Sequence, residues 1–116
     1  MDFYDNEKEI AGLINYQVTR ILVVTLFNGE LKGKAKGFSG IKTIANLRVK
    51  ENQSFDIDFD VNAGKAKMVA VKKKEIIVLA ENHFTGQLTT HLPKGFCRIR
   101  LVGEDADVKI KLRRIS

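Results

Sequence analysis

Hydrophobic and polar residues alternate in short runs over most of this chain, which is the pattern of half-buried β-strands. The clearest run covers residues 54–61, in which Phe55, Ile57, Phe59 and Val61 alternate with Asp56, Asp58 and Asp60. Successive side chains of a strand point to opposite faces of its sheet. This strand should therefore bury one face in a core and present three carboxylates on the other face.

Similar runs continue along the chain. We expect about nine strands, at residues 18–27, 30–37, 41–49, 54–61, 65–71, 76–80, 87–92, 96–102 and 107–114. Turns should lie between them at residues 28–29, 50–53, 62–64, 72–75, 85–86, 93–95 and 103–106. No stretch between strands is long and periodic enough for a crossover helix, so the pattern favours antiparallel pairing. It predicts an all-β chain, with a single antiparallel β-sandwich domain over residues 1–116 of the jelly-roll or Ig-like kind.

Residues 1–15 are expected to form an appendage to this sandwich. A short helix over residues 2–15 could be capped by Asp5 and would place three apolar residues at helical spacing, namely Ile10, Leu13 and Ile14. Gly12 weakens that pattern, and a frayed terminal segment is the alternative.

The run at residues 21–27 is apolar on both faces. It should form a central strand, or be covered by the N-terminal segment or by a partner, because an open apolar edge strand promotes aggregation. Self-association through this run is therefore one expectation.

Two segments of the chain resemble small bacterial β-sandwich modules. They are residues 92–103, with the sequence LPKGFCRIRLVG, and residues 61–71, with the sequence VNAGKAKMVAV. The likeness is one of strands and turns, extends over about residues 38–116, and implies the sandwich fold. Some such modules sit at cell surfaces and some bind carbohydrate, usually through exposed aromatic side chains. This chain has no Trp and two Tyr, so the resemblance implies the fold more than a ligand.

The net charge of +6 is unevenly distributed. Residues 1–31 carry two basic and five acidic groups, whereas residues 32–116 carry 18 basic and nine acidic groups. A basic balance permits binding to phosphates, acidic polymers or acidic protein partners.

Cysteine content and the N-terminus predict a cytoplasmic protein. Cys97 is the only cysteine, so no intramolecular disulfide can form, which fits a reducing compartment. Residues 1–5 lack the basic-then-apolar order of a signal peptide, and no apolar run reaches the ~20 residues of a transmembrane helix. A secreted or surface-attached protein is the alternative if a leader is removed.

The three aspartates begin like an EF-hand calcium loop. Such a loop needs Gly at its sixth position and Glu at its twelfth. Val61 and Lys67 occupy those positions, so an EF-hand is excluded. We interpret Asp56, Asp58 and Asp60 as a solvent-facing column that pairs with Lys or Arg on a neighbouring strand.

Glu81, His83 and His91 are weak candidates for a metal site, since they are the residue types of a facial triad. A three-residue loop at 85–87 would place all three on one face, whereas a two-residue loop at 85–86 would point His91 away. The competing interpretation, which we favour, is a set of polar residues at a solvent-facing hairpin end. We expect no cofactor.

Cys97 should point inward with Ile99 and Leu101 and behave as a small buried hydrophobe. No histidine is placed beside it by the sequence, so we expect no nucleophile and no catalytic residue.

Eight basic residues fall on predicted outward faces and form a candidate binding face: Lys32, Lys34, Lys36, Arg98, Arg100, Lys109, Lys111 and Arg113. If their strands are neighbours, the face could follow a phosphate backbone. A binder of single-stranded nucleic acid would interleave stacking aromatics with these charges, and here the alternating aromatics accompany aspartate.

These observations predict a non-enzymatic binding or interaction module, with a protein or carbohydrate partner. A basic nucleic-acid-binding β-barrel is the first alternative, favoured if the outward basic residues cluster on one face. A metal protein that uses the hairpin site is the second.

Overall fold

The computed structural model describes residues 10–12, 16–18, 21–27, 30–50, 52–90 and 94–115. These residues form seven strands: β1 (Tyr16–Val18), β2 (Ile21–Phe27), β3 (Glu30–Val49), β4 (Ser54–Lys72), β5 (Glu75–Glu81), β6 (His83–Thr89) and β7 (Gly95–Ile115). Every pairing between them is antiparallel.

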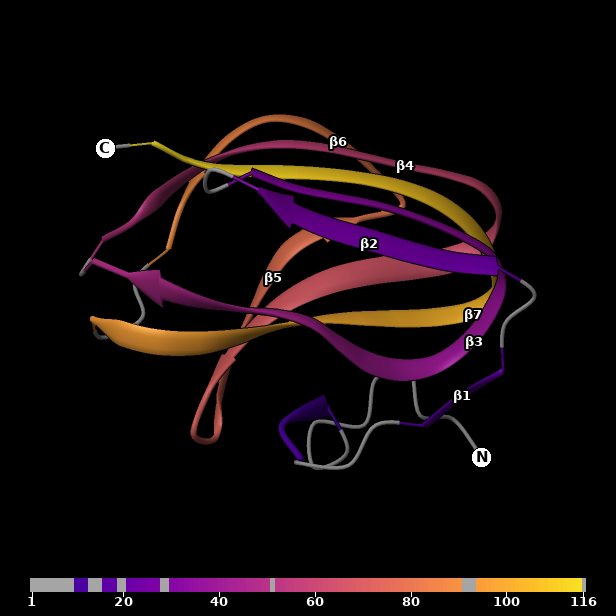
Figure 1. The fold of residues 1–116 in the computed structure, drawn as a ribbon, viewed down its shortest axis with the longest axis horizontal. Helices are drawn as coiled ribbons and strands as arrows, with labels where there is room; N and C mark the ends of the chain where they lie inside the picture. Colours follow the sequence, from indigo (N-terminus) through magenta and orange to yellow (C-terminus); the bar gives the residue numbers. More distant parts are fainter. Residues whose placement is uncertain are drawn as a thin grey trace.

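Three long strands, β3, β4 and β7, bend near their middles and contribute one half to each of two layers (Figure 1). The first sheet runs in the order β2, first half of β3, second half of β7, first half of β4, β6. The second sheet runs in the order β1, second half of β3, first half of β7, second half of β4, β5. The two sheets make an antiparallel β-sandwich, which confirms the predicted fold class.

The core lies between the two sheets and follows the alternation of the sequence. Phe55, Ile57 and Phe59 of β4 are each at most 1% exposed and pack with Leu31 of β3 and Ile110 of β7, as predicted for residues 54–61. Burial of one such side chain stabilises the fold by roughly 1.5–3 kcal/mol.

Two of the predicted turns, at residues 62–64 and 103–106, are wrong because β4 and β7 continue through them. Gly64 has a φ of 67°, and a Cβ there would lie 2.2 Å from the carbonyl oxygen of Asp105. Asp105 itself has a φ of 49°, and the β4–β7 register shifts between Val61 and Lys65. These residues are bulged corners at which each strand passes from one sheet to the other.

The predicted turn at Thr85-Gly86 is also wrong, since both residues lie inside β6. The chain changes sheet earlier, at Asn82, which has a φ of 59°. The Asn82 N–H donates to the Ala66 carbonyl (2.9 Å), and its carbonyl accepts from the Val61 N–H (2.9 Å). As a result β5 and β6 pair with opposite halves of β4 instead of with each other as a hairpin.

Two other turns agree with the prediction. Phe27 pairs directly with Glu30, which closes the hairpin expected around Asn28-Gly29. Lys72 pairs with Glu75 across the charged corner between β4 and β5.

The expectation of a central strand at residues 21–27 is wrong. Among the described strands β2 pairs with β3 alone, so it lies at an edge of the first sheet. Three of its large apolar side chains are substantially exposed: Val23 (58%), Leu26 (48%) and Phe27 (76%). Self-association through this edge stays a prediction.

Residues 10–12 cover the outer face of the second sheet, and the rest of the predicted N-terminal helix lies outside the described residues. Ile10 is 2% exposed and packs with Ile41, Val69, Val71 and Val102. The second sheet is thus covered on both faces around these residues, whereas the described residues leave the outer face of the first sheet open to solvent. Within the described ranges no helix is long and apolar enough to span a membrane.

Candidate binding face

The outer face of the first sheet carries mostly polar side chains in three cross-strand rows, and we call it the polar face. Antiparallel register aligns one residue from each of β2, β3, β7, β4 and β6 in every row. The rows are Val23, Lys34, Lys109, Asp60 and His83; Thr25, Lys32, Lys111, Asp58 and Thr85; and Phe27, Glu30, Arg113, Asp56 and Gln87.

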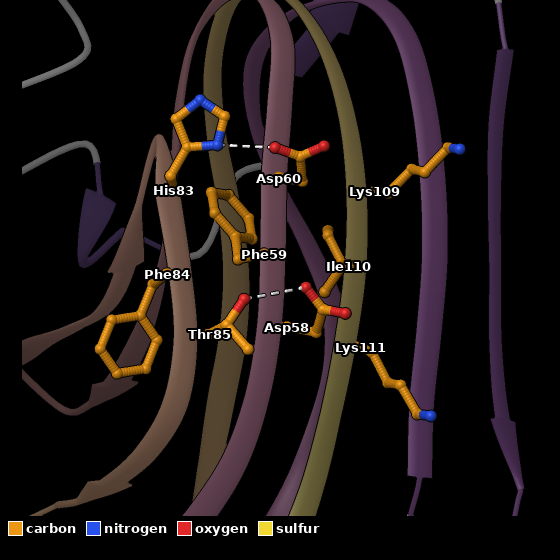
Figure 2. Close-up of a pocket in the computed structure, with 9 residues that line it drawn as sticks. All are labelled: Asp58, Phe59, Asp60, His83, Phe84, Thr85, Lys109, Ile110 and Lys111. Atoms are coloured by element: carbon orange, nitrogen blue, oxygen red, sulfur yellow. Dashed lines mark hydrogen bonds and ion pairs between the residues drawn. The ribbon is translucent and has the colours of Figure 1, made fainter.

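The β4 column of this face is acidic, and each aspartate contacts a neighbouring strand. Asp56 accepts a hydrogen bond from Arg113 of β7 (3.2 Å), which is the cross-strand pairing expected for the column. Asp58 accepts a hydrogen bond from the Thr85 hydroxyl of β6 (3.3 Å). Asp60 Oδ1 lies 2.6 Å from His83 Nδ1 of β6 (Figure 2). Asp58 and Asp60 are therefore engaged by β6, on the side away from β7.

The β3 and β7 columns are basic. They supply six exposed cations: Lys32, Lys34, Lys36, Lys109, Lys111 and Arg113. Register places Lys32 opposite Lys111 and Lys34 opposite Lys109, and like charges directly opposite each other destabilise a sheet. Lys32 has an ion pair with Glu30 (3.2 Å), but within the described ranges no ion pair neutralises Lys34, Lys109 or Lys111.

Two hollows lie along the acidic column and are lined by its neighbouring strands on both sides, β6 and β7. The larger, of about 390 Å³, is lined by residues of β4, β6 and β7 that include Asp58, Asp60, His83 and Lys109. The second, of about 280 Å³, lies beside it around Asp56. Figure 2 shows the side chains of Lys109 and Lys111 extending away from Asp58 and Asp60. Positive and negative charge therefore stay separated across the face.

Arg98 and Arg100 do not belong to this face, because the bend in β7 places them on the second sheet. Arg100 is 0% exposed, so the prediction that it faces solvent is wrong. Its Nη1 donates to the carbonyls of Ile10 (2.8 Å) and Gly12 (2.6 Å). Arg98 is half-buried and donates to the carbonyls of Ala11 and Gly12.

The sequence of β4 contains a signal that the outer face of the second sheet is covered. Residues 66–71 are buried without alternation, and five of the six are apolar. Such a run is typical of a strand that is buried on both faces. It indicates that the neighbouring strand, which carries Arg98 and Arg100, is covered too.

Cys97 is 2% exposed and packs in the core, as predicted. Burial raises the pKa of the Cys97 thiol above its ordinary value, and nearby Lys72 opposes only part of that effect. A buried thiol that stays protonated is a poor nucleophile.

The structure separates two of the three candidate metal ligands and does not describe the third. His91 lies outside the described residues. Glu81 ends β5 in the second sheet, opposite Lys67, whereas His83 starts β6 in the first sheet and contacts Asp60. In the part of the chain that the structure describes, no three His, Cys, Asp or Glu side chains are grouped as metal ligands.

Comparison with known proteins identifies solved structures of similar fold. No protein-family model matches the sequence, and no curated protein matches it either. Among solved structures, a variant of a family 29 carbohydrate-binding module superposes with a TM-score of 0.50 at 14% identity, over 91% of this chain and 80% of that one.

Two further structures of family 29 modules match to a similar degree. A variant in complex with mannohexaose has a TM-score of 0.49 at 16% identity, with 91% of this chain and 86% of that one covered. A variant in complex with cellulohexaose has a TM-score of 0.49 at 13% identity, with coverage of 91% and 85%. The resemblance predicted from strands and turns is confirmed at the level of architecture: this chain shares the β-sandwich fold of family 29 carbohydrate-binding modules.

Proposed function

We propose that the chain is a non-catalytic module that binds a carbohydrate across its polar face. The observation that carries the proposal is the alignment of charged and hydrogen-bonding side chains in three rows on an open sheet. Carboxylates, hydroxyls and ammonium groups all hydrogen-bond to sugar hydroxyls. The solved structures of similar fold are described as carbohydrate-binding modules, which supports the same class of ligand.

The absence of catalysis is part of the proposal. Cys97 is buried in the core and its thiol stays protonated. The carboxylates of Asp56, Asp58 and Asp60 lie on an open face, engaged by Arg113, Thr85 and His83. These positions suit recognition better than a reaction that must exclude water.

Binding of single-stranded nucleic acid is the second candidate, and one observation favours it. Six of the eight predicted basic residues do cluster on one face of the first sheet. Against it, the described part of the polar face has a single aromatic side chain, Phe27, at one corner. Stacking on several aromatics is the usual source of affinity for unpaired bases.

The test is an NMR titration of isotope-labelled protein with mannohexaose, cellohexaose and a hexamer of galacturonic acid. We expect at least one of the three to shift backbone amides of β4, β6 and β7 in the first sheet. The Asp58→Ala variant should weaken that binding about tenfold, which is the cost of one lost charged hydrogen bond of ~1.4 kcal/mol. Lys74→Ala, on the exposed turn between β4 and β5, is the control. Shifts confined to the second sheet, or none with any sugar, would refute the proposal.

A further inference from the structure

We infer that the carbohydrate is an acidic oligosaccharide, whose anionic groups bind the lysines of β3 and β7 while its hydroxyls bind the β4 and β6 columns. This inference rests on the proposed function and adds the chemical class of the sugar. It depends on how charge is arranged on the polar face.

The first argument is that lysines of β3 and β7 face each other in two pairs, and that among the described residues only Lys32 of these four has an ion pair, with Glu30. Lys34 and Lys109 face each other on adjacent strands, as do Lys32 and Lys111. Adjacent strands lie roughly 4.7–4.9 Å apart, and alternate residues of one strand roughly 6.6–6.8 Å apart. The backbone positions of these four lysines therefore form the corners of a small rectangle, which we call the lysine rectangle. A bound anion between them would replace repulsion with two or more charge-assisted hydrogen bonds.

The second argument is that nearby acids leave the other three lysines, Lys34, Lys109 and Lys111, without an ion pair among the described residues. Asp58 and Asp60 contact Thr85 and His83 of β6 instead of the lysines of β7. Figure 2 shows Lys109 and Lys111 extending away from both aspartates. Among the described residues, Lys34, Lys109 and Lys111 remain available to an external anion.

The third argument is the chemistry of the other half of the face. Asp58, Asp60, Thr85 and Gln87 present carboxylate, hydroxyl and amide groups to solvent beside the hollows. All four groups form hydrogen bonds with neutral hydroxyls, and the two carboxylates also repel anions. A ligand that satisfies both halves must carry anionic groups together with free hydroxyls, and a uronic-acid oligomer carries both on every sugar.

A polynucleotide fits this division less well. A deoxynucleotide strand has no free hydroxyls between its ends, so it offers little for the carboxylates of Asp58 and Asp60 to bind. Its bases would also find few aromatic partners among the described residues, because Phe27 stands at the far corner, in β2.

Isothermal titration calorimetry tests the inference with four probes: hexagalacturonate, mannohexaose, cellohexaose and a thymidine hexanucleotide, each at 20 mM and 200 mM NaCl. We expect hexagalacturonate to bind at least tenfold more tightly than the other three at low salt, and to lose most of that advantage at high salt. The double variant Lys34→Gln/Lys109→Gln should lower its affinity at least tenfold. The matched control Lys73→Gln/Lys74→Gln, which removes the same charge from an exposed turn, should change it less than threefold. Thermal melts verify that both variants fold.

The possible outcomes distinguish the acidic ligand from the proposed carbohydrate-binding function. Equal or tighter binding of a neutral hexaose would overturn the acidic ligand and leave the proposed carbohydrate function standing. Tighter binding of the thymidine hexanucleotide than of every sugar would overturn both. Binding to none of the probes would also overturn both. An equal loss of affinity in the control variant would show that net charge, and not the lysine rectangle, attracts the ligand.

Discussion

Arg100 shows how one side chain joins the N-terminal segment to the sandwich. Its guanidinium is buried, and it donates to the carbonyls of Ile10 and Gly12. A buried carbonyl that loses its donor costs free energy, and hydrogen bonds from charged donors are the stronger kind.

The Arg100→Ala variant should therefore lower the free energy of unfolding by about 2–4 kcal/mol. Urea unfolding measures this loss, and Lys74→Ala, on an exposed turn, should stay within about 0.5 kcal/mol of the parent. Hydrogen exchange should also quicken for backbone amides beneath residues 10–12, such as that of Val102. An unchanged urea midpoint would mean that the arginine contributes no net stability.

The buried thiol of Cys97 leads to a prediction about how the stability of the fold depends on pH. Burial raises the pKa of its thiol in the folded state, whereas the unfolded chain keeps a value near 9.0. Below that unfolded value both states hold the proton, and the thiol makes no pH-dependent contribution. Above it the unfolded state binds fewer protons than the folded state, so stability falls as pH rises towards the folded value.

The comparison that isolates this effect is the parent against Cys97→Ala. Between pH 8.5 and pH 10.5 the free energy of unfolding of the parent should fall more steeply than that of the variant. Ellman's reagent should likewise react with the native thiol at least a hundredfold more slowly than with the urea-unfolded thiol, since burial limits both access and ionisation. Parallel pH profiles of the parent and the variant would show instead that the thiol ionises as readily in the folded chain as in the unfolded chain.

At the scale of the strand, Gly64 sets the corner in β4. Its φ of 67° favours glycine, and a Cβ would overlap the backbone oxygens of Glu104 and Asp105 at 2.3 and 2.2 Å. Gly64→Ala should lower the free energy of unfolding by about 3 kcal/mol or more, since backbone strain alone costs ~1–3 kcal/mol.

Gly33→Ala is the matched control for this prediction. Gly33 lies in β3, and an added Cβ would meet Val24 and Ile110 at ordinary contact distances of 3.5 and 3.7 Å. We expect that variant to be neutral or to gain about 0.4–1 kcal/mol from reduced flexibility of the unfolded chain. Thermal unfolding of both variants provides the measurement. Similar melting temperatures for the two would mean that the corner can relax around a methyl group.

The bulged corners of β4 and β7 also show which features of the fold could not be predicted from the sequence. Alternation correctly predicts which side chains of residues 54–61 and 107–114 face the core, because that depends on neighbours along one strand. Asn62-Ala63-Gly64 and residues 103–106 carry the residue types of a turn, but the same types serve a bulge in a continuous strand. Only packing across the sandwich decides between the two.

The polar face was predictable in its parts and not in its assembly. The outward direction of Asp58 and Lys111 follows from alternation, but their adjacency follows from the β4–β7 register, which joins residues far apart in the chain. The same limit applies to Arg100. Its outward direction is correct, yet its burial under residues 10–12 is a long-range contact, and the run at residues 66–71 indicates only that this part of the sheet is covered and not by which segment.

At the scale of the whole molecule, the shared strands predict a single cooperative transition. The strands β3, β4 and β7 each give one half to the first sheet and one half to the second, so neither sheet has an independent set of strands. Their inner faces also meet in one core. Loss of either sheet would expose the core side of the other, which leaves no stable half-folded state.

Differential scanning calorimetry should therefore show one peak with a van't Hoff enthalpy equal to the calorimetric enthalpy, of about 70–90 kcal/mol near 60 °C for a chain of this length. Native-state hydrogen exchange should give similar opening free energies for Ile57 in the first sheet and Ile99 in the second, since both lie in the shared core. Gly64→Ala should lower the melting temperature of that one peak without splitting it. Two resolved peaks, or protection that persists in one sheet after the other exchanges, would show instead that the bends act as boundaries between two folding units.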